Sequence, residues 1–355
     1  MIDSTPVEHS PVAVRYKKII VKRVFWLAVL LLAIVVSLLV DLSIGSSGLG
    51  LFDLLRIIFN PNSASATHQI IIWDIRLPQA LIAILVGASL GLAGAEMQTV
   101  LNNSLASPFT LGVSQAAAFG AALGFILNVG IPGIDPKWLV AGNAFIFALL
   151  ATMLLDVLAR WRQANTSVIV LFGIAIGFTF SALVALLQYV ATAEALQALV
   201  FWTMGSMSRA DWQNITLLAI ALMVAFPFSM RSAWKLTALR LGEDRAASFG
   251  INIKRLRLAS LFRISVLAGL AVAFVGTIGF IGLVGPHIAR MLFGEDHRFY
   301  LPASALSGAL ILSVASVVSK SIIPGVLIPV GIITSLIGIP FFLAIILRTT
   351  ARGRQ

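Results

Sequence analysis

The sequence predicts an all-α polytopic membrane protein of about ten transmembrane helices, with an inverted repeat and discontinuous helices. Of its 355 residues, 59% are hydrophobic and 11% are charged, whereas soluble domains carry about 45–50% apolar and about 25% charged residues. Apolar runs such as 77–95 and 326–347 contain no acid or base, and a helix needs about 20 such residues to cross the hydrocarbon layer. A soluble helical protein of this composition lacks enough polar surface.

Ten apolar segments are expected to cross the membrane. They lie near residues 24–43, 77–100, 110–129, 138–160, 167–190, 212–230, 257–277, 281–294, 301–319 and 326–348. The first is too long for the apolar region of a signal peptide and no cleavage pattern follows it, so we expect it to be retained. The chain thus divides into an N-terminal tail (1–23), one transmembrane domain (24–348) and a C-terminal tail (349–355).

The basic residues predict the orientation of these spans. With the N-terminus inside, 20 of the 25 lysines and arginines fall on the inner side. The outer side receives the other five, which are Arg56, Arg76, Lys137, Arg209 and Lys320. This bias follows the positive-inside rule and places both termini in the cytoplasm. It also explains the net charge of +11 without a nucleic-acid partner.

Few side chains suit chemistry within the spans. The chain has no cysteine, and its four histidines show no ligand-like spacing, so we expect no metal site. His287, beside Pro286, is the sole histidine near a span, and it is better explained as a satisfied residue at a helix end. No G-x-x-x-x-G-K-[ST] loop is present, so the chain is not expected to hydrolyse ATP itself.

One charged segment, LGEDRAASFGINIKRLR (residues 241–257), interrupts the apolar chain on the predicted cytoplasmic side. Gly242 can cap a helix there, Glu243 and Asp244 suit its positive first turn, and Gly250 can end it. The segment predicts a helix of about two turns over about 241–251, too short to be stable alone. It either folds onto its own membrane domain or is presented to a cytoplasmic partner.

Two apolar segments cannot each form one regular helix. LNNSLASPFTLG (101–112) joins two spans without a charge, and GTIGFIGLVGPHIARMLFG (276–294) has a glycine at every third position before Pro286. Irregular backbone at membrane depth is tolerated where it is buried in protein or lines an aqueous cavity. The stretches before the breaks, 85–94 and 267–276, align at a constant offset and cross in opposite directions. This pattern indicates an inverted repeat, which is typical of transporters.

Five motifs, in this order, resemble those of the FecCD-type (BtuC-like) permeases. They are RLPQALIAILVGASLGLAGAEMQTVLNNSLASPFTLGVS, FWTMGSMSRADW, LGEDRAASFGI, GFIGLVGPHIARMLFGEDHRFYLP and LIPVGIITSLIGIPFF. Members of this family are the membrane subunits of type II ABC importers for iron–siderophore complexes, haem and vitamin B12. The resemblance runs from about residue 24 to the C-terminus and identifies 24–348 as a single permease domain.

The resemblance implies roles for particular residues. A coupling helix would dock into the cytoplasmic ATPase through Leu241, Gly242, Glu243, Asp244, Arg245, Ala246, Phe249 and Gly250. The cytoplasmic gate would comprise Asn103, Leu105, Thr166 and Ser167. A periplasmic binding protein would dock near Arg76 and Lys320. LQALVFWTMGSM (196–207) would form the short outer helix at the mouth of the vestibule.

Some positions depart from the family pattern. The usual Asn-Pro-Leu-Ala reads Asn-Ser-Leu-Ala at 103–106, and the usual Arg-Leu-Pro-Arg ends in Gln79. The family's Asp before the outer basic residue is Ser316, and Glu96 replaces an apolar residue. Two interpretations of Glu96 stay open. It is either an interfacial acid that reaches cytoplasmic water, or a gating acid that faces the inner cavity or pairs with a neighbouring polar group.

We therefore expect the permease subunit of a binding-protein-dependent ABC importer, multi-pass in the bacterial inner membrane. Two ABC ATPase subunits per complex would hold ATP-Mg and hydrolyse it, while this chain is no enzyme and binds no cofactor. A second permease chain, either a copy or a paralogue, would complete the pathway. A periplasmic substrate-binding protein would deliver the ligand to the outer mouth.

The expected ligand is an iron–siderophore complex, the commonest substrate of this family, with haem and cobalamin as alternatives. An ion-coupled secondary transporter is a more distant alternative. It would need several intramembrane acids, and only Glu96 qualifies on the sequence. A membrane-embedded enzyme would need a nucleophile and base, or metal ligands, within the spans. Co-purification with an ATPase would separate the first class from the other two.

Overall fold

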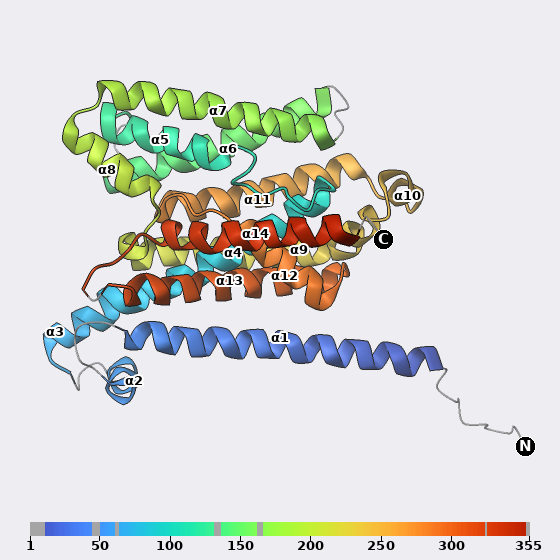
Figure 1. Ribbon diagram of the computed structural model, residues 1–355, viewed down its shortest axis with the longest axis horizontal. Helices are drawn as coiled ribbons and strands as arrows, with labels where there is room; N and C mark the ends of the chain where they lie inside the picture. Colours follow the sequence, from blue (N-terminus) through green and yellow to red (C-terminus); the bar gives the residue numbers. More distant parts are fainter. Residues whose placement is uncertain are drawn as a thin grey trace, which may run out of the picture.

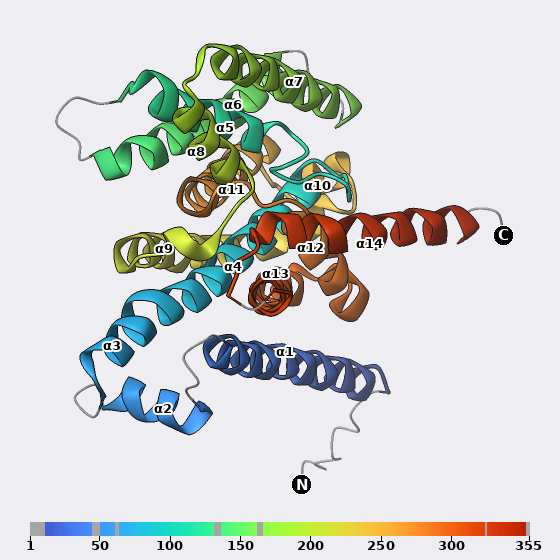
Figure 2. The same ribbon diagram turned by 60° about the vertical axis from the view of Figure 1, so that its left-hand side comes forward.

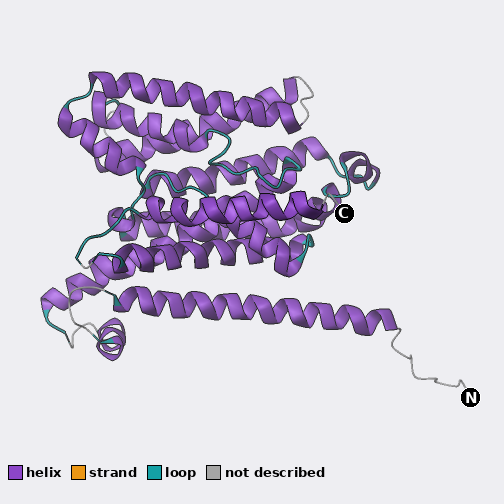
Figure 3. Cartoon of the chain, viewed as in Figure 1, coloured by secondary structure: helices purple, strands orange, loops and turns teal. Residues whose placement is uncertain are grey.

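The computed structural model describes residues 11–44, 50–60, 64–130, 136–161, 166–323 and 325–352. Within these ranges every regular element is a helix (Figure 3). Seven helices are long and apolar enough to cross a membrane, and three shorter apolar helices accompany them. The prediction of an all-α membrane protein with about ten spans is confirmed.

Ten helices correspond to the ten predicted spans. They are α1 (Pro11–Ser43), α4 (Leu77–Val100), α5 (Val113–Leu127), α6 (Pro136–Trp161), α7 (Thr166–Val190), α9 (Trp212–Leu239), α11 (Ile253–Val275), α12 (Ile281–Phe293), α13 (His297–Ser321) and α14 (Val330–Arg352). Of these, α1 and α9 extend well beyond the predicted spans. The short elements are α2 (Leu51–Phe59), α3 (Ala66–Gln69), the π-helix η2 (Ile70–Arg76), α8 (Ala193–Thr203), the 3₁₀ turn η3 (Met207–Arg209) and α10 (Glu243–Ser248).

The helices at both ends of the chain extend beyond the expected spans. The first helix begins at Pro11 rather than near residue 24, so most of the expected tail is helical. Lysine and arginine are good helix formers, and proline is favoured at the first helical position. Arg23 lies 3.2 Å from Asp296 and its guanidinium stacks 5.1 Å from the ring of Phe299, which holds this part of α1 against the bundle. At the other end α14 continues to Arg352.

The second span is longer than predicted, because helical structure begins upstream of its proline. Helical structure runs from Ala66 through η2 into α4, and Pro78 lies in the first turn of α4. Proline lacks a backbone N–H, and its ring clashes with the carbonyl of the residue four positions earlier. The wider π-helical turn before Pro78 makes room for the ring. The amphipathic helix α2, which the span analysis missed, buries Leu54 and Ile57 against this extension.

α4 and α11, which run in opposite directions, form the centre of the bundle. α4 packs against α13, and α11 packs against α6; α1 and α7 lie on opposite sides of this core (Figures 1 and 2). Gly87 and Gly91 permit the first contact, since a Cβ at either would lie 2.4 Å or less from a carbonyl oxygen of α13. Gly269, which aligns with Gly87, faces Phe145 of α6 in the second contact. Equivalent glycines therefore serve equivalent helix pairs, as the inverted repeat requires.

Both predicted breaks are present. The first covers residues 101–112, and its last residue, Gly112, has φ +81°. The second is shorter than expected, because only 276–280 are irregular and α12 is helical through Pro286. Proline leaves the carbonyl four residues earlier without its helical donor. The side-chain amide of Gln98 donates to that carbonyl, on Gly282, at 3.5 Å.

Candidate functional site

The charged segment forms the expected short helix, α10. Gly242 is the N-cap with φ +110°, and Glu243 and Asp244 occupy the first turn. Gly250, with φ +76°, follows the C-cap and donates to Ala247, while Ile251 donates to Ala246. These two bonds form a Schellman motif. The capping residues are thus the ones predicted from the sequence.

Most residues of α10 and of the turns beside it are exposed at the protein surface. Ala246 is fully buried and anchors the helix, whereas the other residues predicted to form the coupling helix, Leu241, Gly242, Glu243, Asp244, Arg245, Phe249 and Gly250, are exposed. Phe249 remains 54% exposed although its ring centroid lies 6.2 Å from that of Trp234. α10 lies at the same end of the bundle as the start of α1 and the end of α14 (Figure 1). An exposed aromatic side chain on a capped, anchored helix suits insertion into a groove of another protein.

The first break lines a cavity of about 460 Å³ between α5 and α7. Asn103 and Leu105 both border it, and α7 contributes Val170, Gly173 and Ile174. The Oδ1 of Asn103 accepts from the backbone N–H of Leu105 at 2.9 Å, which supplies the tight turn where the family has proline. The first segment predicted to form the gate therefore borders a cavity together with α7, the helix that begins at Thr166.

The other predicted gate residues begin α7. Thr166 is the first residue of this helix and Ser167 the second. Their side chains lie outside the described part of the structure. The gate role of these two residues stays a prediction that rests on their position at the inner end of α7.

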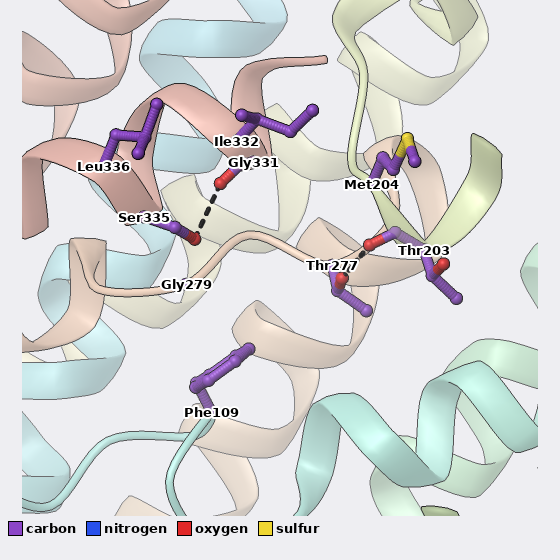
Figure 4. Close-up of a pocket in the computed structure, with 9 residues that line it drawn as sticks. All are labelled: Phe109, Thr203, Met204, Thr277, Gly279, Gly331, Ile332, Ser335 and Leu336. Carbon is purple, nitrogen blue, oxygen red and sulfur yellow. Dashed lines mark hydrogen bonds between the residues drawn. The ribbon is translucent and has the colours of Figure 1, made fainter. Parts of the chain in front are cut away.

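A second cavity, of about 410 Å³, lies between the two breaks and α14 (Figure 4). Phe109 of the first break faces it, and its ring centroid lies 6.4 Å from that of Phe280 in the second break. The hydroxyl of Thr277 donates to the carbonyl oxygen of Thr203, at the end of α8, and Ser335 donates to Gly331 at 2.8 Å. The residues around this cavity are Phe109, Thr203, Met204, Thr277, Gly279, Gly331, Ile332, Ser335 and Leu336, none of which is charged. An uncharged lining suits weak binding along a pathway that must release its ligand.

Glu96 does not reach cytoplasmic water. It is 1% exposed, and its carboxylate accepts two hydrogen bonds from Arg263 of α11, at 2.6 and 3.0 Å. Ser229 of α9 donates to the same carboxylate, and Ser260 accepts from Arg263 at 3.0 Å. The interfacial interpretation is therefore excluded by the structure, and the acid pairs with neighbouring polar groups. A gating role for Glu96 stays a prediction.

The two predicted docking residues are turned into the protein. Arg76 is 6% exposed and donates to the carbonyl oxygen of Leu42 at 2.8 Å. The ammonium of Lys320 lies 3.1 Å from the carboxylate of the fully buried Asp41. Ser316 donates to that carboxylate at 3.2 Å. In this conformation neither positive charge is presented to a partner, so their docking role stays a prediction.

The sequence alone assigns no specific role to three residues that the structure places in ion pairs. Asp41 lies near the end of the first predicted span. Arg263, which pairs with Glu96, and Arg240, which pairs with Glu295 at 2.6 Å, are among the bases predicted on the inner side. A usable signal for Arg263 was present, because a single base within an apolar span requires a partner, and Glu96 was the sole acid at comparable depth in the sequence.

The described side chains give no sign of metal chemistry. Within the described ranges no three histidine or acidic side chains come together as a metal site. His287 is half-buried and its ring lies 6.0 Å from that of Phe341 in an edge-to-face contact. This packing agrees with the interpretation of His287 as a structural residue.

Comparisons with known proteins match this chain to one family of transport proteins. The sequence profile of the FecCD transport family matches residues 30–348. The hemin transport system permease protein of Yersinia pestis is 36% identical and the Fe(3+)-citrate import system permease protein of Bacillus subtilis 38% identical. The alignments cover 90% and 89% of this chain and 96% and 93% of those proteins.

Two further relatives extend this picture. The vitamin B12 import system permease protein of Klebsiella pneumoniae is 36% identical over 92% of this chain and 95% of its own length. A solved inward-facing conformation of a transporter assigned to the metal-chelate ABC type superposes with a TM-score of 0.78 at 29% identity. That superposition covers 94% of this chain and 99% of the other.

Proposed function

The chain belongs to the FecCD transport family, and we propose that it carries an iron–siderophore complex across the inner membrane as the permease of a binding-protein-dependent importer. It is a multi-pass ABC importer permease and a transport subunit. The observation that supports its place in an ATP-driven complex is α10, a capped helix anchored by Ala246 that exposes the rest of its surface. Two ATPase subunits would grip two such helices, one from each permease chain, and both termini would lie in the cytoplasm.

The cavity between the breaks supports a chelated cargo. Fe(III) in a siderophore is fully coordinated by the chelator, so the complex shows a pathway only the outer surface of its organic ligand. Hydroxyl groups and apolar side chains around the cavity suit such a surface, and the residues that line it include no histidine, cysteine or acid that would compete for the iron. Haem and cobalamin are the alternatives, because relatives named for hemin, ferric citrate and vitamin B12 are about equally similar.

The buried acids disfavour an ion-coupled secondary transporter. Among the described side chains, Asp41 is paired with Lys320 and Glu96 with Arg263. A carboxylate held by a cationic side chain is poorly suited to load and release a proton or sodium ion during each cycle. The free energy of transport is therefore assigned to ATP hydrolysis in partner subunits.

Purification and uptake test the proposal together. A tag on this chain should recover an ATPase and a second permease chain from detergent extracts. Proteoliposomes that contain this complex, supplied with the periplasmic binding protein, should accumulate ⁵⁵Fe-siderophore only with internal ATP-Mg. Unlabelled hemin or cobalamin in excess should leave that uptake unchanged. Uptake that persists without ATP, or that responds to a sodium or proton gradient, would exclude an ABC importer; strong competition by cobalamin would reassign the cargo.

A further inference from the structure

Arg240 lies between the coupling helix and the helix that supports it. It is the C-cap residue of α9, three residues before α10. The intervening turn is closed by backbone hydrogen bonds from Leu241 to Ala238 at 3.0 Å and from Gly242 to Leu239 at 3.1 Å. This turn is short and hydrogen-bonded, so a displacement of α10 should move the backbone of Arg240 with it.

The guanidinium of Arg240 binds two separate segments. Nη2 and Nε donate to the two oxygens of Glu295, at 2.6 and 3.1 Å, on the loop between α12 and α13. Nη1 donates to Oδ1 of Asn102 at 2.7 Å. The planar fork suits this arrangement, because two donors match a carboxylate and the third is held at a defined angle. Lysine carries the charge but has no such fork.

Asn102 is the second residue of the first break and directly precedes the predicted gate residue Asn103. Its φ is +44°, the left-handed conformation that asparagine tolerates better than most residues. The N–H of Asn103 then donates to the carbonyl of Gln98, at 3.0 Å, and Asn103 holds the backbone of Leu105. The side chain that Arg240 grips is thus attached to the turn that positions the gate residues.

A second connection reaches the same turn from Glu295. Nε of Arg290 lies 3.3 Å from Glu295, and its Nη2 donates to the side chain of Gln98 at 3.2 Å. Tyr300 also donates to that side chain, at 3.3 Å. Glu295 is thereby held between two arginines, one of which contacts the end of α4 just before the gate turn. The side-chain hydrogen bond from Arg240 is the main reason that the pKa of Glu295 lies below its ordinary value.

We propose that Arg240 is a positioning residue that transmits movement of the coupling helix to the gate turn through Asn102, with Glu295 fixing the angle of its guanidinium. The proposal rests on the function proposed above, since it requires an ATPase that moves α10. It does not require a continuous chain of contacting residues through the protein core. One side chain links the two segments directly, because both meet at the same end of the bundle.

The natural absence of cysteine from the chain permits a direct test. Leu105, which is 44% exposed, is replaced by cysteine in the complete complex in proteoliposomes. The rate of its reaction with a hydrophilic maleimide is measured with and without AMP-PNP-Mg, and the labelled chain is separated on a gel. With Arg240 and Asn102 intact, nucleotide should change the rate by roughly fivefold or more, the lower end of typical coupling between sites.

Matched variants isolate the proposed contact. Asn102→Gly removes the side chain and keeps the positive φ without strain, whereas Asn102→Asp keeps the acceptor. The nucleotide response should fall to roughly twofold or less in Asn102→Gly and Arg240→Gln, and it should survive in Asn102→Asp. Arg298→Gln is the control, because Arg298 forms a similar pair with Asp296 at 2.8 Å on the same loop but does not contact the gate turn. ATP hydrolysis by each complex is recorded in parallel.

The possible results separate this inference from the function on which it rests. Loss of the response in Asn102→Gly and Arg240→Gln, with nucleotide binding and Arg298→Gln normal, supports the role of Arg240. An unchanged response in both variants overturns it and leaves the importer intact. If Arg240→Gln fails to assemble, Arg240→Lys retains the charge, and its full response would equally overturn the proposal. Absence of any nucleotide response in the complex with Arg240 and Asn102 intact would overturn the relay, whereas the importer is tested separately by ATP-dependent uptake.

Discussion

The guanidinium of Arg263 binds the carboxylate of Glu96 through two donors, with Nη2 2.6 Å from Oε2 and Nε 3.0 Å from Oε1. The pair joins α4 to α11, the two central helices that correspond in the inverted repeat. Ser229 adds α9, so both helices that flank α10 are tied to α4, which leads into the first break. Desolvation makes such a pair weak evidence for stability, but it makes the loss of one partner costly.

Glu96→Gln should therefore destabilise the protein by about 3–5 kcal/mol, because it leaves the charge of Arg263 buried and unpaired. Thermal unfolding of the purified chain in detergent measures this. Replacing both residues, Glu96→Gln with Arg263→Gln, should recover most of the loss. Additive losses in the double variant would show that the two charges do not interact. A changed basal ATPase activity in an assembled Glu96→Gln complex between pH 6 and 8 would add a gating role.

The ion pair between Asp41 and Lys320 can be tested by moving its acid from α1 to α13. Asp41→Ser should destabilise the chain, since Lys320 is left buried without an acid. Adding Ser316→Asp should restore stability, because Ser316 already contacts Asp41 and stands four residues before Lys320 on α13. Unfolding temperatures of the two variants check this. If the double variant is no more stable than Asp41→Ser, the acid cannot be moved between helices.

The same pair affects the docking prediction. If Arg76 and Lys320 dock the binding protein, reversing their charges should weaken its attachment, more strongly at low salt. Because both side chains are buried, we expect the loss of folded protein to come first. Size-exclusion chromatography of the double reversal, followed by binding titrations at two salt concentrations, distinguishes these effects. A folded variant with weaker, salt-dependent binding would restore the docking role.

Phe249→Asp should uncouple ATP hydrolysis from transport without preventing membrane insertion. Phe249 is 54% exposed on α10, so a carboxylate there costs little in the isolated chain but is repelled by an apolar groove on a partner. Ligand-stimulated ATPase activity in proteoliposomes measures coupling, and Phe249→Leu is the conservative control. Unchanged stimulation in Phe249→Asp would remove the coupling role of this residue.

Gly91→Ala tests the close packing of α4 on α13. A Cβ at this position would lie 2.2 Å from the carbonyl oxygen of Ser304, whereas a Cβ at Gly142 of α6 meets no atom within 4 Å. Gly91→Ala should lower stability by about 1–3 kcal/mol through overpacking. Gly142→Ala should be neutral or stabilising by up to about 1 kcal/mol. Equal unfolding temperatures for the two variants would contradict the close approach of these helices.

We expect the stabilising contribution of the Glu295 carboxylate to be lost at low pH. Its pKa is lowered mainly by the hydrogen bond from Arg240, so its contribution is present above the ordinary value of 4.5 and is lost as the pH falls through the depressed value. Asp296 beside it has a lowered pKa as well, chiefly through Arg298. The difference in unfolding temperature between the natural protein and Glu295→Gln should therefore shrink below about pH 4. A difference independent of pH would show that the charge of Glu295 contributes nothing.

The sequence by itself determined the ten spans, the two breaks, and the caps of α10. Each of these depends on local chemistry: the run of apolar residues needed to cross a bilayer, glycine and proline in the chain, and the capping of a short helix by Gly242 and Gly250. Errors at this level were also local. The second span extends upstream of Pro78 through a π-helical turn, and the basic start of α1 is helical.

Only the tertiary structure decided the partners of the charged residues. Glu96 and Arg263 lie 167 residues apart and Arg240 and Asn102 138 apart, so no local pattern connects them. A charge on a predicted span is equally compatible with snorkelling, pairing or facing a cavity, and these outcomes differ only in which helix packs alongside. Packing of α4 against α11 and α9 turned Glu96 inward, and packing of α1 against α13 turned Lys320 away from the outer surface.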